Sequence, residues 1–178
     1  MKQIRIVTTL AVLMIFGAAM YMSSCKPNAC ITRAVECKNG GTCRDGDCIC
    51  ASGYEGDSCQ FTVNKKFDSY YACIRTRLIN ETTIEDNDDT LRVKPLSTDK
   101  FGIRIYSIRD SVYEVLSAKV NGNYITIPEQ TFFWADTLKY YGSGSLNNGV
   151  LTLTVYSEKL DPFSNWNAKT TYVGYKFD

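Results

Sequence analysis

Histidine is absent from this chain of 178 residues, and the 105 residues after Cys73 contain no cysteine. Without histidine, Ser-His-Asp and Cys-His nucleophilic machinery and histidine-ligated zinc are excluded. An excess of charge of one sign is also lacking, because 20 Lys and Arg stand against 19 Asp and Glu, a net charge of +1. Binding to nucleic acid depends on clustered basic residues that release counterions from phosphates. We therefore expect no nucleic-acid partner.

Paired carboxylates with a recognisable spacing are missing as well. A glycosidase needs two carboxylates positioned on either side of a cleft, and no local pattern singles out acids such as Glu114 and Glu129. General acid–base catalysis by a tyrosine or a carboxylate stays formally open. We expect that the protein is not an enzyme and uses no cofactor.

The first 24 residues have the layout of an export signal. Lys2 and Arg5 provide a positive start, and an apolar run follows over residues 6–22. This run is slightly shorter than the ~20 apolar residues of a spanning helix. The expected interpretation is a signal peptide over residues 1–24, removed on export.

The end of this segment, Ser23-Ser24-Cys25, resembles the lipobox of bacterial lipoproteins. The resemblance implies that Cys25 carries an acyl anchor such as palmitate and that residues 25–29 form the lipidated N-terminus. It also implies a bacterial cell envelope location, at the outer membrane, with the membrane as a partner. Met22 departs from the usual Leu of the box. An uncleaved membrane anchor and a plain secreted protein remain as alternatives.

Six cysteines crowd into the next 30 residues, at intervals of six, five, four, one and eight residues: Cys30, Cys37, Cys43, Cys48, Cys50 and Cys59. So small an exported unit cannot bury enough apolar surface to fold without cross-links, so we expect a disulfide framework. Spacing alone leaves fifteen pairings open.

The residues between the cysteines carry a more specific pattern. Residues 37–43 read C-x-N-G-G-x-C, and residues 48–59 read C-x-C-x-x-G-Y-x-G-x-x-C. Residues 30–59 thus resemble an epidermal growth factor-like (EGF-like) module. The resemblance implies the disulfides Cys30–Cys43, Cys37–Cys48 and Cys50–Cys59. Residues 26–29 contain no carboxylate, so we expect no calcium site and no metal, because calcium needs anionic oxygens.

The position of this module suggests a role. Four residues separate Cys25 from Cys30 and reach ~14 Å when extended, which would place the module almost on the bilayer. A rigid spacer is the favoured interpretation, and a specific protein-binding role is the alternative. The junction over residues 60–66 has no flexible Gly/Ser tract, which favours close docking of the module on the next domain.

The remaining chain, residues 67–178, alternates between apolar and polar residues with period two. Asn121-Gly122-Asn123 and Asn147-Asn148-Gly149 lie between alternating runs, which is typical of β-hairpins. The expected strands cover residues 70–78, 91–95, 101–108, 112–120, 124–128, 137–146, 150–157 and 169–177, with 131–135 less certain. We predict a mainly β fold, an antiparallel up-and-down β-barrel, with a two-sheet sandwich as the alternative.

Two details of this region bear on the site. Ala72, Ile74, Thr76 and Leu78 share one face of the first strand, and the pair Gly142 and Gly144 suggests a bend or a close approach of backbones. The phrases ITIPEQ and GSGSLNNGVLTLTV and the closing aromatic strand resemble lipocalin-like domains of Gram-negative surface lipoproteins. That resemblance implies a fold and a compartment, but no ligand.

Clustered aromatic residues are the candidate ligand-binding residues, because sugars stack on aromatic rings and apolar ligands enter aromatic-lined barrels. Neighbours in a strand point to opposite faces, so one member of each adjacent pair is expected outside or at a rim. Packing in the core, or plugging of the barrel end by Phe163 or Trp166, is the competing interpretation. The candidates are Phe133, Trp134, Tyr141 and Trp166, from the groups 132–134, 140–141 and 163–166.

Two further features are interpreted structurally. The acidic run over residues 85–89 is expected to be a solvated turn, with calcium binding as the weaker alternative. Cys73, the thiol left over, is expected to be a small buried residue, with an intermolecular contact as the alternative.

Together these patterns predict a non-enzymatic, lipid-anchored envelope protein whose barrel binds a glycan, an apolar small molecule or a partner protein. The alternative is a structural or adhesive module without a ligand pocket. A cavity of ~300 Å³ or more inside the barrel would favour ligand binding, and a filled interior would favour the alternative.

Overall fold

The computed structural model describes residues 29–107, 115–133, 136–161 and 166–177, and the side chains of residues 83–86 are not described. The predicted signal peptide and Cys25 lie outside these ranges. Within the described ranges, no helix combines the length and the apolar character that crossing a bilayer requires.

The cysteine-rich module contains little regular structure: α2 (Ala29–Thr32), β1 (Thr42–Arg44), β2 (Asp47–Ile49), β3 (Tyr54–Glu55) and β4 (Phe61–Thr62). Strand β1 pairs with β2, and β3 pairs with β4. Over residues 29–62, the buried residues are Gly53 and Cys59. Because so little apolar surface is buried, cross-links must hold this unit together.

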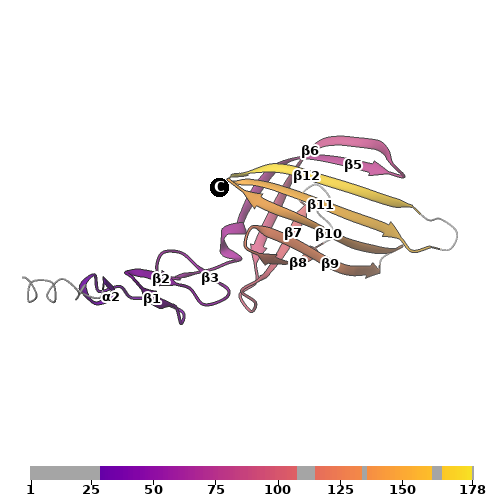
Figure 1. Ribbon diagram of the computed structural model, residues 1–178. Coiled ribbons are helices and arrows are strands. Elements are labelled where there is room, and N and C mark those ends of the chain that lie inside the picture. The colour runs from indigo at the N-terminus through magenta and orange to yellow at the C-terminus, as the bar shows by residue number, and fades with distance from the viewer. Residues whose placement is uncertain (1–28, 108–114, 134–135, 162–165, 178) are drawn as a thin grey trace, which may run out of the picture.

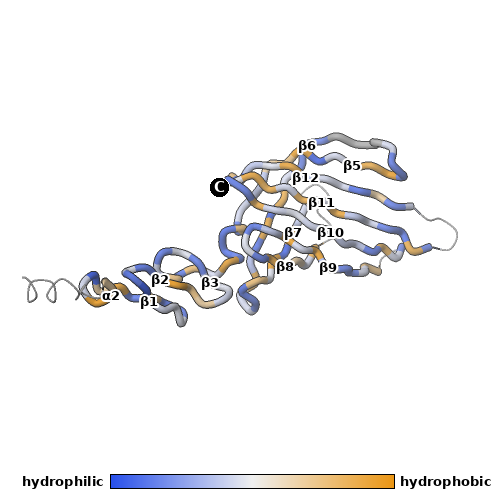
Figure 2. Tube along the Cα trace, in the orientation of Figure 1, coloured by the Kyte–Doolittle hydropathy of each residue, from blue (hydrophilic) through white to orange (hydrophobic). Residues whose placement is uncertain are grey.

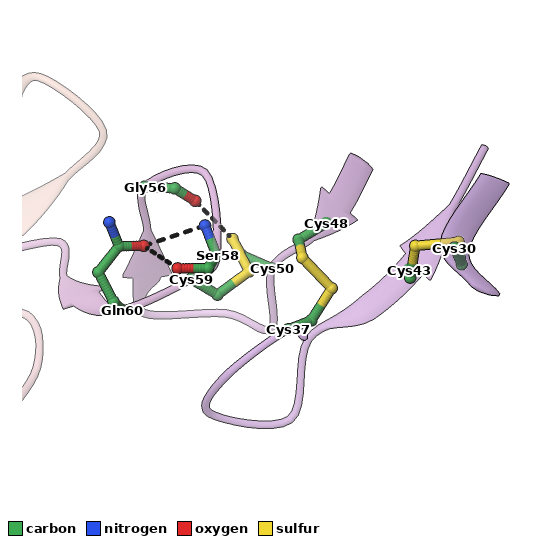
Figure 3. The surroundings of a disulfide bond; sticks show 9 residues. All are labelled: Cys30, Cys37, Cys43, Cys48, Cys50, Gly56, Ser58, Cys59 and Gln60. Carbon is green, nitrogen blue, oxygen red and sulfur yellow. Dashed lines mark hydrogen bonds between the residues drawn. A yellow bond between two sulfur atoms is a disulfide. The ribbon is translucent and has the colours of Figure 1, made fainter. Parts of the chain in front are cut away.

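Three disulfides supply those cross-links, and they follow one another along the module (Figure 3): Cys30–Cys43, Cys37–Cys48 and Cys50–Cys59. This is the pairing that the EGF-like resemblance implies. Beside the last of them, Gln60 Oε1 accepts hydrogen bonds from the Ser58 amide at 3.0 Å and the Ser58 hydroxyl at 2.8 Å. These bonds close the loop that leads out of the module.

Eight antiparallel strands close into a barrel in which each strand pairs with its neighbours in sequence, and β12 pairs with β5. The predicted up-and-down barrel is confirmed, and the sandwich alternative is wrong because closure leaves a single sheet without edges. The 3₁₀ turn η1 (Lys65–Phe67) leads into the strands, which are β5 (Ser69–Ile79), β6 (Thr82–Pro95), β7 (Gly102–Ser107), β8 (Val115–Asn121), β9 (Tyr124–Phe133), β10 (Thr137–Asn147), β11 (Val150–Lys159) and β12 (Asn167–Phe177).

The barrel has two different ends (Figure 1). The module joins one end, where the short turns 122–123 and 148–149 also lie, and these are the two predicted hairpins. Strand β11 ends and β12 begins at the opposite end, where the turn between β5 and β6 also lies. Below, these are the module end and the open end.

The acidic residues 85–89 are not a loop, which corrects the sequence interpretation. They belong to β6, where Glu85 pairs with Arg77 and Asp89 pairs with Cys73 of β5. Their charged side chains favoured a turn in the sequence interpretation. In the structure, the backbone hydrogen bonds between β5 and β6 continue through residues 85–89, because pairing with a neighbouring strand overrides a weak strand propensity. Residues 131–133, the uncertain strand, extend β9.

The apolar core fills the module end of the barrel. Phe67 and Tyr71 are fully buried there, and the Tyr71 hydroxyl donates to the Phe67 carbonyl at 3.1 Å. Hydrophobic and hydrophilic residues alternate along the strands (Figure 2), so each strand presents one face to this core. Other side chains that are buried to 3% exposure or less include Val93, Ile103, Val120, Ile125 and Leu151.

Gly142 and Gly144 mark a close approach of two backbones, as the sequence suggests. A Cβ atom at Gly142 would lie 2.2 Å from the Thr154 carbonyl oxygen, and one at Gly144 would lie 2.4 Å from the Thr152 carbonyl oxygen. The pairing of β9 with β10 shifts register between Tyr140 and Gly142. Only glycine leaves room for the backbone of β11 at these two positions.

The junction between module and barrel is a packed joint. Asn64 is 1% exposed, and its Nδ2 donates to the carbonyls of Leu96, Asp99 and Gly102 at 3.2, 2.9 and 2.9 Å. The Asn64 amide also donates to the Lys100 carbonyl at 3.2 Å. One side chain thus ties the connecting segment to the turn between β6 and β7.

Contacts across the joint come from the module as well. Lys100 places its ammonium 4.4 Å from the centroid of the Tyr54 ring and donates to the Ser52 carbonyl at 3.3 Å. Gly53 has φ of +88°, and a Cβ there would lie 3.1 Å from Lys100 and 3.2 Å from Phe101. The close docking expected from the short junction is present in the structure.

Candidate functional site

A cavity of about 330 Å³ occupies the half of the barrel toward the open end. Its lining comes from every strand of the barrel except β9, together with Trp166 just before β12. An eight-stranded barrel is just wide enough either to be filled by side chains or to hold one small ligand. Here the side chains of the described residues fill the module end and leave a cavity in the other half.

Most of the cavity wall is apolar or aromatic. Leu91 and Leu153 are fully buried or nearly so and form part of both the core and the lining. Tyr140 and Tyr172 are each 8% exposed and present rings from β10 and β12. The remaining apolar lining residues are Ile105, Leu116, Leu138 and Val155.

Two arginines interrupt this apolar wall. Arg75 and Arg77 stand two residues apart on β5, so both side chains point to the same side of the sheet, and both line the cavity. Arg75 is 3% exposed. Placing cationic groups in an apolar interior is costly unless an anion or aligned dipoles compensate them.

The surroundings of Arg77 are only partly polar. Its guanidinium lies 5.7 Å from the centroid of the Trp166 ring, a cation–π contact. Its Nε is buried and has no hydrogen-bond partner in the part of the chain that the structure describes. One donor of this side chain therefore stands ready for an acceptor from outside the protein.

Hydroxyl groups and one carboxylate complete the polar side of the cavity. Ser107, Ser157 and Thr170 contribute hydroxyls to the lining. The Ser107 hydroxyl donates to Asp89 Oδ2 at 2.8 Å, and the Thr90 amide donates to Asp89 Oδ1 at 2.6 Å. Asp89 is 6% exposed, so it places a buried negative charge beside the cavity wall.

The aromatic residues named from the sequence are split between the two faces, as alternation demands. Phe132 and Tyr140 turn inward and make an edge-to-face contact with centroids 5.5 Å apart. Phe133 is 79% exposed on the outside of β9, away from the cavity. Of the predicted ligand-binding residues that the structure describes, Trp166 is the one on the cavity lining. Trp134 and Phe163 lie outside the described residues.

Tyr141 lies on the outer wall. Its ring stacks on Tyr156 with centroids 5.2 Å apart, and its hydroxyl donates to Glu158 Oε1 at 2.9 Å. Lys139 contacts the same carboxylate at 2.7 Å. The hydrogen bonds from Lys139 and Tyr141 hold the pKa of Glu158 below its ordinary value. A second pocket, of about 470 Å³, includes Tyr141 and Tyr156 and shares Ser157 with the lining of the barrel cavity.

Cys73 is 4% exposed and is not part of a disulfide, so its expected role as a small buried residue is confirmed. Burial raises the pKa of the thiol to about 11. A thiol that stays protonated at neutral pH is a poor nucleophile. The sulfur of Cys73 packs against the backbone of β12 at Gly174, where an added Cβ atom would lie 2.3 Å from it.

The sequence interpretation missed Arg75 and Arg77. Their strand has a more apolar face, made by Ala72, Ile74 and the residues that follow at intervals of two, but that face points outward, and Ile74 is 59% exposed. Tyr71 and Cys73 share the inward face with the arginines. One signal could have identified the inward face. Tyr71 and Cys73 are of residue types that are often buried, and Arg75 and Arg77 follow them at intervals of two on the same face of the strand.

Comparison with known proteins finds a similarity that covers only part of this chain. Over 38 residues, 21% of this chain, the sequence is 47% identical to a neurogenic locus notch homolog protein of Giardia intestinalis. The aligned segment spans 6% of that protein's length. With the disulfide-rich structure, this similarity fits an EGF-like module. No protein-family model matches the chain.

Fold and site together define the class of this protein: an EGF-like module joined to a closed eight-stranded antiparallel barrel with an internal cavity. This combination is consistent with a binding or interaction domain.

Proposed function

We propose that this protein is a non-enzymatic, lipid-anchored protein of the bacterial outer membrane whose barrel binds a small molecule. The observation that carries the binding function is the cavity of about 330 Å³ with a mixed aromatic, apolar and polar lining. Ligand sites in proteins are cavities of ~300–1,000 Å³ with mainly apolar walls and a few polar groups. A barrel that served only as a contact surface would gain stability from a filled interior.

The module acts as a rigid spacer in this proposal. It extends from the end of the barrel opposite the turn between β5 and β6, so an anchor at Cys25 would leave the open end of the barrel facing away from the membrane (Figure 1). The Asn64 hydrogen bonds and the Lys100–Tyr54 contact support a fixed angle between the two parts. A ligand would then enter from the side that is not covered by the module.

Native mass spectrometry of the full chain, purified from bacterial membranes into phosphatidylcholine nanodiscs, tests the binding function. We expect a bound species after incubation with a lipid and metabolite extract of the envelope. The substitution Leu153→Trp, which places a larger side chain in the cavity wall, should abolish that species. Its control is Thr152→Trp on the outer face, which should not. An unliganded protein in every extract would contradict the proposed function.

The anchor has its own test. Intact mass of the exported protein should show loss of residues 1–24 and addition of acyl groups at Cys25, and Cys25→Ala should remove both changes. An unmodified N-terminus in the exported protein would contradict the anchor without affecting the cavity.

A second candidate function, protein–protein interaction, is favoured by the outer face of β5 and β12. Ile74 and Val173 are paired in register and are 59% and 44% exposed, and Tyr175 on the same face is 70% exposed. Exposed apolar patches often mark contact surfaces. Size-exclusion chromatography with light scattering, comparing the native chain with Ile74→Lys, would detect self-association through this face.

A further inference from the structure

The polar groups of the cavity identify the kind of ligand more closely. We infer that the barrel binds a small monocarboxylate with an apolar body, whose carboxylate group is held by Arg75 and Arg77. This inference rests on the proposed ligand-binding function. It adds the charge and the orientation of the ligand.

The first argument is the charge balance of the cavity. Its described lining residues include two guanidinium groups and no carboxylate. Asp89 adds one negative charge next to the lining through Ser107. Among the side chains that the structure describes, two positive groups and one negative group leave one positive charge, which a single anionic group would balance. A phosphate monoester carries ~1.5–2 negative charges at neutral pH and would overcompensate it.

The second argument is the geometry of the donors. A guanidinium presents its N–H groups in a planar fork that matches the two oxygens of a carboxylate. The Nε of Arg77 is one donor of such a fork, and it is buried without a partner among the described residues. A buried donor that is left unsatisfied destabilises the empty protein, so an acceptor that reaches it binds favourably.

The third argument is the rest of the wall, which fits the apolar body of such a ligand. Leu91 and Leu153 offer aliphatic surface, and the Tyr140 and Tyr172 rings close the sides. The Arg77 guanidinium makes its cation–π contact with the Trp166 ring at the open end. A ligand carboxylate that reaches Arg77 must therefore change the environment of Trp166, which makes Trp166 a reporter of binding.

The test uses hexanoate, 1-hexanol, hexylamine and hexyl phosphate as probes of equal alkyl length. The full chain carrying Trp134→Phe, which leaves Trp166 as its sole tryptophan, is placed in phosphatidylcholine nanodiscs and titrated while the fluorescence of Trp166 is recorded. Empty nanodiscs correct for partition into lipid. Hexanoate is expected to bind at least about tenfold more tightly than 1-hexanol and hexyl phosphate, because hydrogen bonds to charged groups contribute ~1.5–3 kcal/mol. Hexylamine is expected not to bind.

Arg77→Met, which keeps an unbranched side chain against Trp166 but removes the charge, should weaken hexanoate binding about 10- to 100-fold and leave 1-hexanol unchanged. The matched control is Arg104→Met on the exposed face of β7, which should change neither affinity. If Arg77→Met fails to fold by circular dichroism, Arg77→Lys keeps the charge, loses the fork and should weaken hexanoate binding by a smaller factor.

The outcomes separate this inference from the proposed function. Equal affinities for hexanoate and 1-hexanol would overturn the carboxylate assignment and keep the binding function. An equal loss of hexanoate binding in Arg77→Met and Arg104→Met would also overturn it, as would absence of hexanoate binding. Absence of any ligand from both the extracts and the probes would overturn the binding function itself.

Discussion

At the scale of single residues, a few buried polar side chains have specific tasks. The two hydrogens of Asn64 Nδ2 lie within reach of three backbone carbonyls around the turn between β6 and β7, those of Leu96, Asp99 and Gly102, and its side-chain oxygen accepts from the Thr62 hydroxyl at 2.7 Å. Buried carbonyls without donors are costly, so this side chain stabilises the turn and the joint together.

Replacing Asn64 by Ala should lower the free energy of unfolding by about 1–3 kcal/mol, because the Leu96 carbonyl loses its side-chain donor and the Asp99 and Gly102 carbonyls keep only their bonds from backbone amides. Urea titration followed by circular dichroism measures the change. The control is Asn123→Ala, whose exposed Nδ2 contacts Asn147 at 3.3 Å and should matter little. Equal stability of the Asn64→Ala variant and the native chain would show that water molecules replace Asn64 as the donor to these carbonyls.

Asp68 at the same joint makes the stability depend on pH. Its carboxylate bonds to Lys65 at 2.5 Å and to Arg92 at 2.6 Å, and the bond to Lys65 is the main reason that its pKa is lowered from 3.8. A carboxyl group whose pKa is lower in the folded protein stabilises it above the unfolded value and loses this effect as pH falls through the folded value.

Asp68→Asn should therefore destabilise the protein near neutral pH, by about 1 kcal/mol or less, and have no effect once the pH lies well below the folded pKa. Urea titrations across the acid range measure this difference. Asp57→Asn, at an exposed position of the module, is the control and should have no effect at either extreme. A difference that persists unchanged into strong acid would rule out the ion pairs as its cause.

Cys73 should be unreactive in the folded protein. Burial and a pKa of about 11 predict that a thiol reagent at mildly alkaline pH modifies Cys73 only after urea is added. Absorbance of the released chromophore measures this reaction, and Cys73→Ala identifies the signal. Rapid modification of Cys73 without urea would show that the barrel opens near β12.

At the scale of elements, β10 illustrates how a barrel closes. The two glycines let β11 approach closely, next to the position where the pairing with β9 shifts register. Larger residues at these positions would force backbones apart rather than fill a gap.

Gly142→Ala should destabilise the barrel by about 1–3 kcal/mol, because the new Cβ would overlap the Thr154 carbonyl. Thermal unfolding followed by circular dichroism compares it with Ser143→Ala, an exposed neighbour in the same strand. A loss of stability that is equal in both variants would point to strand propensity in place of the close approach.

At the scale of the whole molecule, the cysteine-rich module and the barrel are stabilised in different ways. The module depends on three disulfides, and the barrel depends on an apolar core and a closed ladder without disulfides among its described residues. The joint connects them through hydrogen bonds and ion pairs rather than through a shared core.

Reduction with dithiothreitol should therefore unfold the module and leave the barrel folded. Limited proteolysis should cut within residues 30–59 after reduction, while the β-sheet circular dichroism signal and its melting temperature change little. Cooperative loss of the barrel signal on reduction would show that the joint couples the two parts more strongly than its contacts suggest.

Much of this architecture follows from local sequence alone. The six cysteines with their glycine spacing led to the EGF-like module, and Asn-Gly turns between alternating runs led to an up-and-down meander. The acidic residues 85–89 were misassigned to a turn, because their charge outweighed a pairing with β5 that is visible only in three dimensions.

What the sequence by itself determined is therefore the order of the parts: a candidate export signal, a cross-linked module and a chain of antiparallel strands. Only the tertiary structure decided which face of β5 points inward, because alternation with period two defines two faces and closure against β12 selects between them. That choice brings Arg75 and Arg77 onto one cavity lining with Trp166, about 90 positions later in the chain. No local pattern contains this contact, since it arises when the last strand pairs with the first.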